Sequence, residues 1–278
     1  MATSSGPPVQ TVDDVLDALD ALVDRARRRG ERTGFFAVMY RTVTARVKEG
    51  IAAGFFDDGE RMARLDVAFA SRYLDALRSS ESGERPTASW DAALAAGRDA
   101  RPILLQHLLL GVNAHINLDL GIAAAGAAPG GELPALRRDF DRINEILASV
   151  LDHVQRAMSR LSPCLGLLDR LGGRHDDEII RFSLEKARAG AWRFATELAP
   201  LDPTAWAGPV RTRDARVARV ARIVLRPGLP LEAGLVVVRA CERSSVARTL
   251  DVLGDVDGPA LAAVEARVRD ERAGPGHW

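Results

Sequence analysis

The sequence contains few of the features that mark a compartment or a charged partner. Its two cysteines, Cys164 and Cys241, lie far apart and lack metal-ligand spacing, a usage typical of the reducing cytoplasm. Residues 1–10 lack the basic and apolar regions of a signal peptide. The 38 Lys and Arg residues balance 38 Asp and Glu residues, which argues against a nucleic acid or an anionic membrane as the main partner. We therefore expect a soluble, cytoplasmic protein.

Motifs that identify common enzyme classes are also missing. The chain has no glycine-rich phosphate loop, no GxSxG, HExxH or CxxC motif, and no Glu-x-x-His helix pair of the ferritin-like di-iron type. Acidic clusters at residues 57–60 and 176–178 resemble those that hold magnesium diphosphate in all-helical isoprenoid enzymes, and His175-Asp176 resembles a metal phosphohydrolase dipeptide. Helix capping explains these positions better. A metal- or diphosphate-dependent hydrolase or cyclase is therefore only a further alternative.

The dominant feature that is present is a nearly continuous apolar run, residues 102–128. It is long enough to cross a bilayer, but its buried polar side chains would make a membrane span costly. A helix that is apolar on all sides is normally buried in a core. We therefore predict a buried central helix at about 102–125. The polar residues that interrupt it are Gln106, His107, Asn113, His115, Asn117 and Asp119.

These polar residues form two stripes on a helix that turns about 100° per residue. One stripe holds three amides, those of Gln106, Asn113 and Asn117. A buried amide without a partner costs about 1–3 kcal/mol, so this stripe either fixes the helix register through hydrogen bonds or contacts a bound molecule. The opposite stripe holds His115 and Asp119, an i, i+4 pair. A carboxylate that orients an imidazole is used by general bases and by metal ligands, and it also occurs as a purely structural pair.

Helical periodicity continues through the rest of the chain, without a partnered strand. The pattern predicts an all-α fold, a single multi-helix bundle of roughly nine to eleven helices around the central one. We expect a disordered tail at residues 1–10, one helical domain at 11–273 with a sub-boundary at 199–210, and a loose tail at 274–278. Further helices are expected at 35–53, 60–77, 133–161 and 259–273, with one starting near Asp176 and another near Arg213. The helix at 133–161 should pack antiparallel to the central one after so short a break.

Two acids outside the central helix lie within apolar arcs. Asp66 shares its arc with Phe69 and Tyr73, and a buried acid of this kind is usually paired, here with an arginine such as Arg72. Asp139 lies within the apolar arc of the helix at 133–161. If that helix packs antiparallel to the central one, Asp139 should approach Asp119.

Three stretches resemble an uncharacterised, mainly bacterial family catalogued as domain of unknown function 5995. They are Gln106 to Leu120 (QHLLLGVNAHINLDL), Arg137 to Asn144 (RRDFDRIN), and Phe182-Ser183 with Arg188 and Ala191-Trp192. The resemblance covers about residues 33–255, and its central motif is distinctive. It implies no activity, so the function has to be argued from the residues.

Our first hypothesis is a soluble enzyme that acts on a small organic molecule by general acid/base chemistry. His115 would be the base, Asp119 would orient it, and Asp66 or Asp139 would supply a second carboxylate. The expected substrate-binding residues are Asn113, Asn117, His107 and Tyr73. A divalent metal such as iron, zinc or manganese could assist, with His115 and Asp119 as candidate ligands. The alternative is a non-catalytic binding or scaffold protein whose buried polar network is structural.

Overall fold

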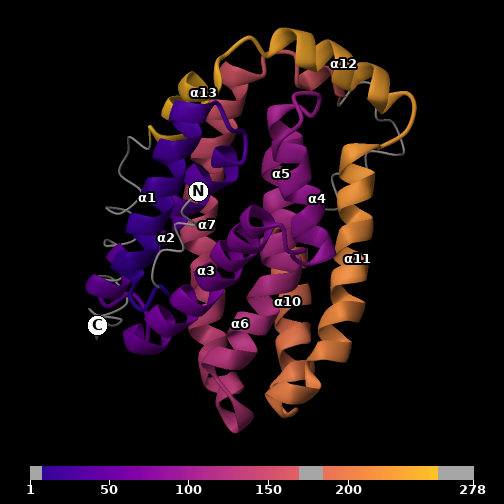
Figure 1. Ribbon diagram of the computed structural model, residues 1–278. Coiled ribbons are helices and arrows are strands. Elements are labelled where there is room, and N and C mark those ends of the chain that lie inside the picture. The colour runs from indigo at the N-terminus through magenta and orange to yellow at the C-terminus, as the bar shows by residue number, and fades with distance from the viewer. Residues whose placement is uncertain (1–7, 169–183, 256–278) are drawn as a thin grey trace, which may run out of the picture.

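The computed structural model describes residues 8–168 and 184–255, which form an all-α bundle with no strand (Figure 1). The predicted fold class is therefore confirmed. The helix expected at 259–273, the clusters at 175–178 and the tail at 274–278 lie outside the described residues. The eleven α-helices of the described part are α1 (Val12–Arg29), α2 (Gly34–Ala52), α3 (Gly59–Ser82), α4 (Ala88–Gly97), α5 (Leu104–Ala114), α6 (Leu120–Ala127), α7 (Leu133–Leu161), α10 (Leu184–Leu198), α11 (Ala207–Leu225), α12 (Leu231–Cys241) and α13 (Val246–Gly254).

The central helix is a single helical rod, residues 104–127, made of α5, a π-helical turn at His115–Asp119 and α6. Its length and composition would also suit a membrane span, but most of it is buried inside the bundle. Helices α2, α3, α4, α10 and α11 pack around it. The buried central helix predicted from the apolar run is therefore confirmed.

The amide stripe fixes the register of α11 against the central helix. Gln106 donates to the carbonyl of Val224 at 2.7 Å, and Asn113 donates to that of Val217 at 3.0 Å. The two donors are seven residues apart on α5, and their acceptors are seven residues apart in the reverse order on α11. This is the arrangement of an antiparallel helix pair. Asn117 extends the stripe by donating to the side chain of Asn113 at 3.0 Å. The structural interpretation of the three amides therefore agrees with their contacts.

One local expectation after residue 199 is wrong. Helix α11 begins at Ala207 rather than near Arg213, and only a 3₁₀ turn at Pro203–Ala205 separates it from α10. Helices on both sides of this segment pack against the central rod. Val236 to Val238, which have strand propensity, lie in α12, where Val236 and Val237 are exposed. Helical packing overrides strand propensity there because no neighbouring strand exists among the described residues to pair with.

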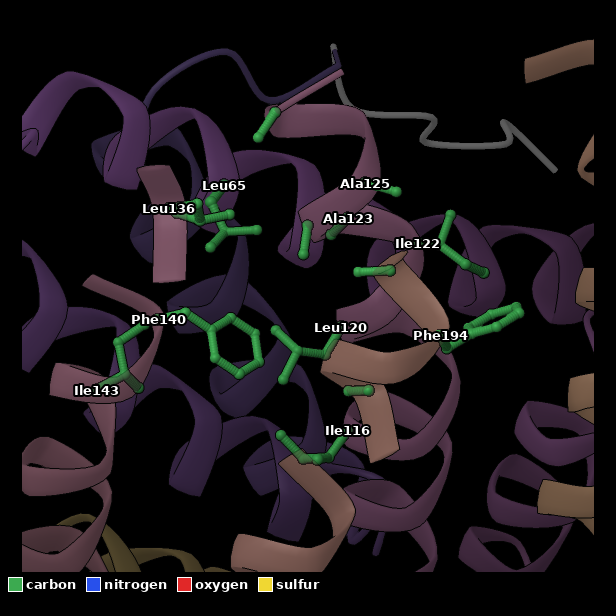
Figure 2. Close-up of a cluster of buried hydrophobic side chains, with 14 of the residues drawn as sticks. Leu65, Ile116, Leu120, Ile122, Ala123, Ala125, Leu136, Phe140, Ile143 and Phe194 are labelled. Carbon is green, nitrogen blue, oxygen red and sulfur yellow. The ribbon is translucent and has the colours of Figure 1, made fainter. Parts of the chain in front are cut away.

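Helix α7 runs antiparallel to the central helix, as predicted, but packs mainly against α2, α10 and α13 (Figure 1). At its beginning it reaches the central helix through side chains, where Phe140 points toward Leu120 (Figure 2). Further along α7 the two helices are separated by a cavity. Direct contact with the central helix is therefore confined to the beginning of α7, and a cavity lies between the two helices beyond it.

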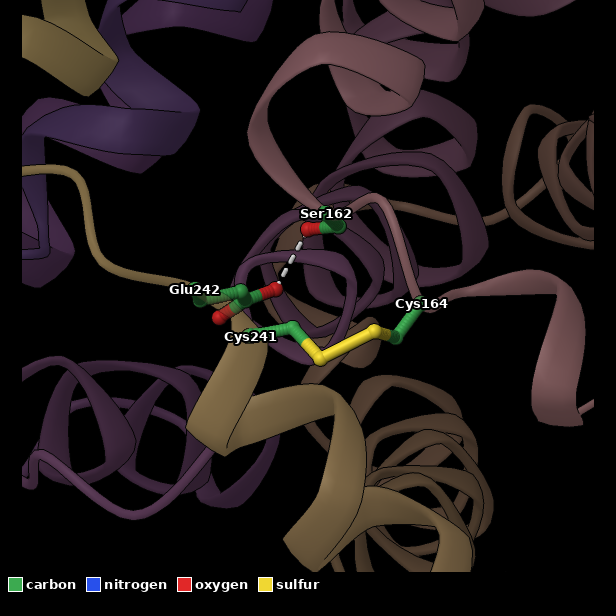
Figure 3. The surroundings of a disulfide bond; sticks show 4 residues. All are labelled: Ser162, Cys164, Cys241 and Glu242. Atoms are coloured by element: carbon green, nitrogen blue, oxygen red, sulfur yellow. Dashed lines mark hydrogen bonds between the residues drawn. A yellow bond between two sulfur atoms is a disulfide. The ribbon is translucent and has the colours of Figure 1, made fainter.

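A disulfide joins Cys164, after α7, to Cys241 at the end of α12 (Figure 3). Beside it, the hydroxyl of Ser162 donates to the carboxylate of Glu242, which also accepts from the backbone N–H of Leu104 at 3.1 Å. The expectation of two unrelated cysteines is therefore wrong. Sequence separation hid the pairing, because the fold brings positions 77 residues apart within 6.2 Å between their Cα atoms.

Candidate functional site: a cavity beside the central helix

A cavity of about 580 Å³ lies between the central helix and helices α2, α3, α7 and the start of α10. This volume is typical of a site for a small molecule. Its wall is mostly aliphatic and aromatic, and it is interrupted by a small number of polar side chains. These are Tyr40, Asp66, His115, Asn144, Glu185 and Arg188.

His115 faces this cavity from the first residue of the π turn. Its ring stacks on Phe69 with 3.5 Å between centroids and makes an edge-to-face contact with Tyr40 with 4.4 Å between centroids. Neither ring nitrogen has a hydrogen-bond partner in the described part of the chain. Burial lowers the pKa of His115 below its usual value. The ring is therefore neutral at neutral pH and has a nitrogen free to accept a proton.

Asp119 lies behind His115, away from the cavity. Its Oδ1 accepts from Nε of Arg72, and its Oδ2 accepts from Nε1 of Trp90, each at 2.7 Å. Nδ1 of His115 is 3.6 Å from Oδ2, slightly beyond hydrogen-bond distance. The predicted proximity of His115 and Asp119 is present, but the π turn directs the carboxylate toward α3 and α4. Single π turns of this kind are frequent at functional sites.

Asp66 lines the cavity from α3 and is 6% exposed. The predicted ion pair with Arg72 is wrong, because Arg72 pairs with Asp119 instead. Oδ2 of Asp66 has no hydrogen-bond partner among the described residues, and burial raises the pKa of this carboxyl to about 7. Both protonation states of Asp66 are therefore populated near neutral pH.

Arg188 enters the same cavity from α10 and is 3% exposed. It donates through Nη2 to the carbonyl of Phe140, and its guanidinium lies 4.3 Å from the centre of the Phe140 ring. Its Nε has no hydrogen-bond partner in the part of the chain that the structure describes. Burial lowers the pKa of Arg188 to about 10, so it remains positively charged at neutral pH.

Comparison with known families places these residues in a wider context. The model of the family of unknown function DUF5995 matches residues 12–227. The chain belongs to this family. The match starts earlier and ends earlier than the resemblance recognised in the sequence, and it includes all the cavity-lining residues, from Phe36 to Arg188. No curated protein and no solved structure matches the chain.

Sequence reasoning on this DUF5995 chain did not identify Arg188 as a site residue, although a signal was present. With Leu184 as origin, Arg188 lies at about 40° on a helical wheel, beside Ala191 and Ala195 at about 340° and 20°. A charged residue in an apolar arc is the same anomaly that singled out Asp66. The helix was expected to start at Asp176, and Arg188 was noted only as part of the resemblance.

Other predicted site residues do not line the cavity. Asn113 and Asn117 face α11, while Tyr73 stacks on Trp90 with 4.9 Å between centroids. His107 lies edge-on to Phe35, and burial lowers its pKa to about 4. These four residues belong to the packing of the central helix.

Asp139 is also separated from the cavity. Its oxygens accept from the backbone N–H groups of Asp57 at 2.7 Å and Asp58 at 3.0 Å, and Arg61 lies 3.3 Å away. The predicted approach to Asp119 is wrong, because Asp139 instead fixes the loop before α3. The acidic cluster at 57–60 has a structural role there, since Asp58 caps α3 by accepting from the N–H of Arg61.

A metal centre on His115 and Asp119 finds no support in the geometry. Within residues 8–168 and 184–255, no three His, Cys, Asp or Glu side chains come together as a ligand set. Both oxygens of Asp119 already accept hydrogen bonds from Arg72 and Trp90. The titratable side chains that line the cavity include those of Asp66 and His115.

Proposed function

We propose that this chain is an enzyme that acts on a small, largely apolar organic molecule by general acid/base chemistry in the cavity beside the central helix. One observation carries the proposal: two titratable side chains, Asp66 and His115, line the same apolar cavity and have no hydrogen-bond partner among residues 8–168 and 184–255. Unpaired buried polar groups are energetically costly and tend to occur at functional sites.

Asp66 is suited to exchange a proton with the substrate. A general acid or base is most effective when its pKa lies near the working pH, and burial brings that of Asp66 to about 7. His115 is suited to accept a proton because burial keeps its ring neutral. Since Nδ1 faces Asp119, Nε2 is the nitrogen that would meet the substrate, and the imidazolium that forms would be stabilised by the Asp119 carboxylate. Arg72 and Trp90 hold that carboxylate in place.

Proton transfer is the step shared by isomerisation, cyclisation and hydrolysis, and we propose no narrower reaction. A second candidate function is a non-catalytic carrier of the same kind of molecule. Two observations favour a carrier. The wall of the cavity is predominantly apolar, and the amide stripe fixes the register of α11 instead of contacting the cavity. Neither candidate requires a nucleic acid or a membrane as partner. A cytoplasmic location stays a prediction. It was argued from two unpaired cysteines, and the disulfide removes that argument because such bonds persist mostly in oxidising compartments.

Turnover of an apolar metabolite extract in D₂O separates an enzyme from a carrier. Wild type should consume a component or place deuterium on it, as followed by mass spectrometry. Asp66→Asn and His115→Gln should each reduce this rate by about 10²–10⁴-fold, the usual contribution of a general acid or base. His107→Gln is the matched control, since His107 is a buried histidine of the same helix outside the cavity wall. A component that is retained but never converted would identify a carrier instead.

A further inference from the structure

Within the described part of the chain, Arg188 is a buried cation without a matching anion. No carboxylate oxygen of the described residues lies within 4.0 Å of its guanidinium nitrogens, and its neighbours are a carbonyl and the ring of Phe140. Glu185, one turn earlier on α10, lines the same cavity but forms no ion pair with it. A buried charge normally has a partner of opposite sign, because its desolvation is otherwise uncompensated. The missing anion is best supplied by a ligand.

A second cavity adjoins the first and shares part of its wall. It has a volume of about 560 Å³ and lies between α5, α7, the end of α11 and α12. The two cavities share four apolar wall residues, Leu105, Leu109, Leu151 and Val154. Along α7 the combined wall runs from Ile143 to Ser162, which at 1.5 Å per residue is about 28 Å. Joined past these shared residues, the two cavities would form one long apolar slot with the positive charge of Arg188 near one end.

Resting on the proposed function, we propose that the ligand is a long-chain monocarboxylic acid. Its carboxylate would accept from Nε–H of Arg188, and its chain would extend past Leu109 into the second cavity. The single positive charge of Arg188 matches a head group of one negative charge, and its buried Nε–H has no partner among the described residues. Asp66 and His115 line the cavity that contains Arg188 and not the second one, so the acid/base chemistry would act near the carboxylate end of the chain.

Direct binding measurements on the full chain test this assignment. Hexadecanoate should bind, octanoate should bind more weakly by about 3- to 4-fold per methylene removed, and hexadecan-1-ol should bind weakly. Arg188→Met should weaken hexadecanoate binding at least 100-fold and leave hexadecan-1-ol binding unchanged. Arg193→Met, an exposed arginine on the same helix, is the matched control and should change neither.

Several outcomes would overturn the assignment. These are equal affinity of wild type for the acid and the alcohol, hexadecanoate binding that survives Arg188→Met, and tighter Arg188-dependent binding of hexadecyl phosphate, which would indicate a phosphate head group. If Arg188→Met does not fold, Leu109→Trp at the junction replaces it. This variant should weaken hexadecanoate binding to the level of octanoate while octanoate binding is unchanged, and equal loss for both acids would contradict the proposed path of the chain.

The same measurements keep this inference separate from the acid/base proposal. Asp66→Asn and His115→Gln should retain hexadecanoate binding within a few-fold, because neither removes the cation or the slot. If those variants lose turnover of another substrate while Arg188→Met has no effect on hexadecanoate, the acid/base proposal stands and the ligand class is wrong. If hexadecanoate binds through Arg188 and no turnover is found, the chain is a carrier.

Discussion

Arg72 of α3 and Asp119 of the π turn form an ion pair that joins the third helix to the central one, with 2.7 Å between Nε and Oδ1. The pair is asymmetric, because the Arg72 side chain is 29% exposed and that of Asp119 is 1% exposed. Trp90 of α4 donates to the other oxygen of Asp119, so a single carboxylate connects three helices behind His115. Nδ1 of His115 lies 3.6 Å from Oδ2 of the same carboxylate.

Removing Arg72 should lower the free energy of unfolding more than removing the charge of Asp119. Arg72→Met leaves a buried carboxylate without its cation and should lower the free energy of unfolding by about 3–5 kcal/mol. Asp119→Asn leaves an arginine that can reach solvent, so its cost should be smaller. Urea denaturation of both variants and of the double variant measures the difference. A double variant that is no more stable than Arg72→Met alone would contradict the assignment of the cost to the unpaired charge.

Asp66 should make stability depend on pH in a defined direction. Its pKa is raised from 3.8 to about 7 in the folded protein, so between these values the folded state binds more protons than the unfolded state. Stability therefore falls as pH rises from about 4 to about 7 and then stays level, by up to about 4 kcal/mol from this group. Asp66→Asn removes this loss, so the variant should gain stability relative to wild type over that range.

The contribution of Asp66 is the difference in the free energy of unfolding between Asp66→Asn and wild type at each pH. Burial lowers the pKa of His107 and of His115, so both histidines remove stability as pH falls below about 6.5. These contributions are common to wild type and Asp66→Asn, and they cancel in the difference. Chemical denaturation of both proteins between pH 4 and pH 8 gives the comparison. A difference that does not change with pH would show that Asp66 is solvated or paired.

The sequence was sufficient for the features that depend on local chemistry. Helix capping explains the acidic cluster at 57–60, as expected, because Asp58 caps α3. The bounds of α7 agree with the apolar periodicity. For the amide stripe, spacing left a structural and a ligand-binding role open, and the hydrogen bonds of Gln106 and Asn113 to α11 favour the structural one. The first two features follow from spacing along one helix, which is readable without knowing its neighbours.

The parts of the site that depend on neighbouring helices were not predictable in this way. A helical wheel assumes the same rotation at every residue, so it cannot predict the π turn. That turn directs Asp119 toward Arg72. The assignment of Arg72 to Asp66 failed because two acids competed for one arginine, and only tertiary packing decides between them. The cavity arises from the distance between α7 and the central helix, a quantity that periodicity does not contain. Asp66 and Arg188 were nevertheless detectable as charged residues in apolar arcs.

Two glycines of the central rod should respond to alanine in opposite directions. A Cβ at Gly111 would lie 2.5 Å from ring atoms of Phe36, a cavity-wall residue, so Gly111→Ala should displace that ring and cost about 1–3 kcal/mol. A Cβ at Gly126 of α6 would meet nothing within 4 Å. Gly126→Ala should therefore stabilise the protein by about 0.5–1 kcal/mol, the usual helical preference for alanine. Thermal denaturation of both variants checks the sign, and a destabilising Gly126→Ala would contradict the packing at that position.

The disulfide should contribute measurably to stability because it closes a long loop. Cys164 and Cys241 are 77 residues apart, and the chain-entropy model gives about 4.5 kcal/mol for a loop of this length. Measured values are often smaller, so we expect a loss of about 2–4 kcal/mol in Cys164→Ser or under reducing conditions. The Cys164→Ser/Cys241→Ser double variant is the control, because a reductant should not change its stability. Wild type with equal stability under oxidising and reducing conditions would show that the bond does not form.

Since Ser162 and Leu165 flank Cys164 and line the second cavity, reduction should also weaken hexadecanoate binding more than octanoate binding.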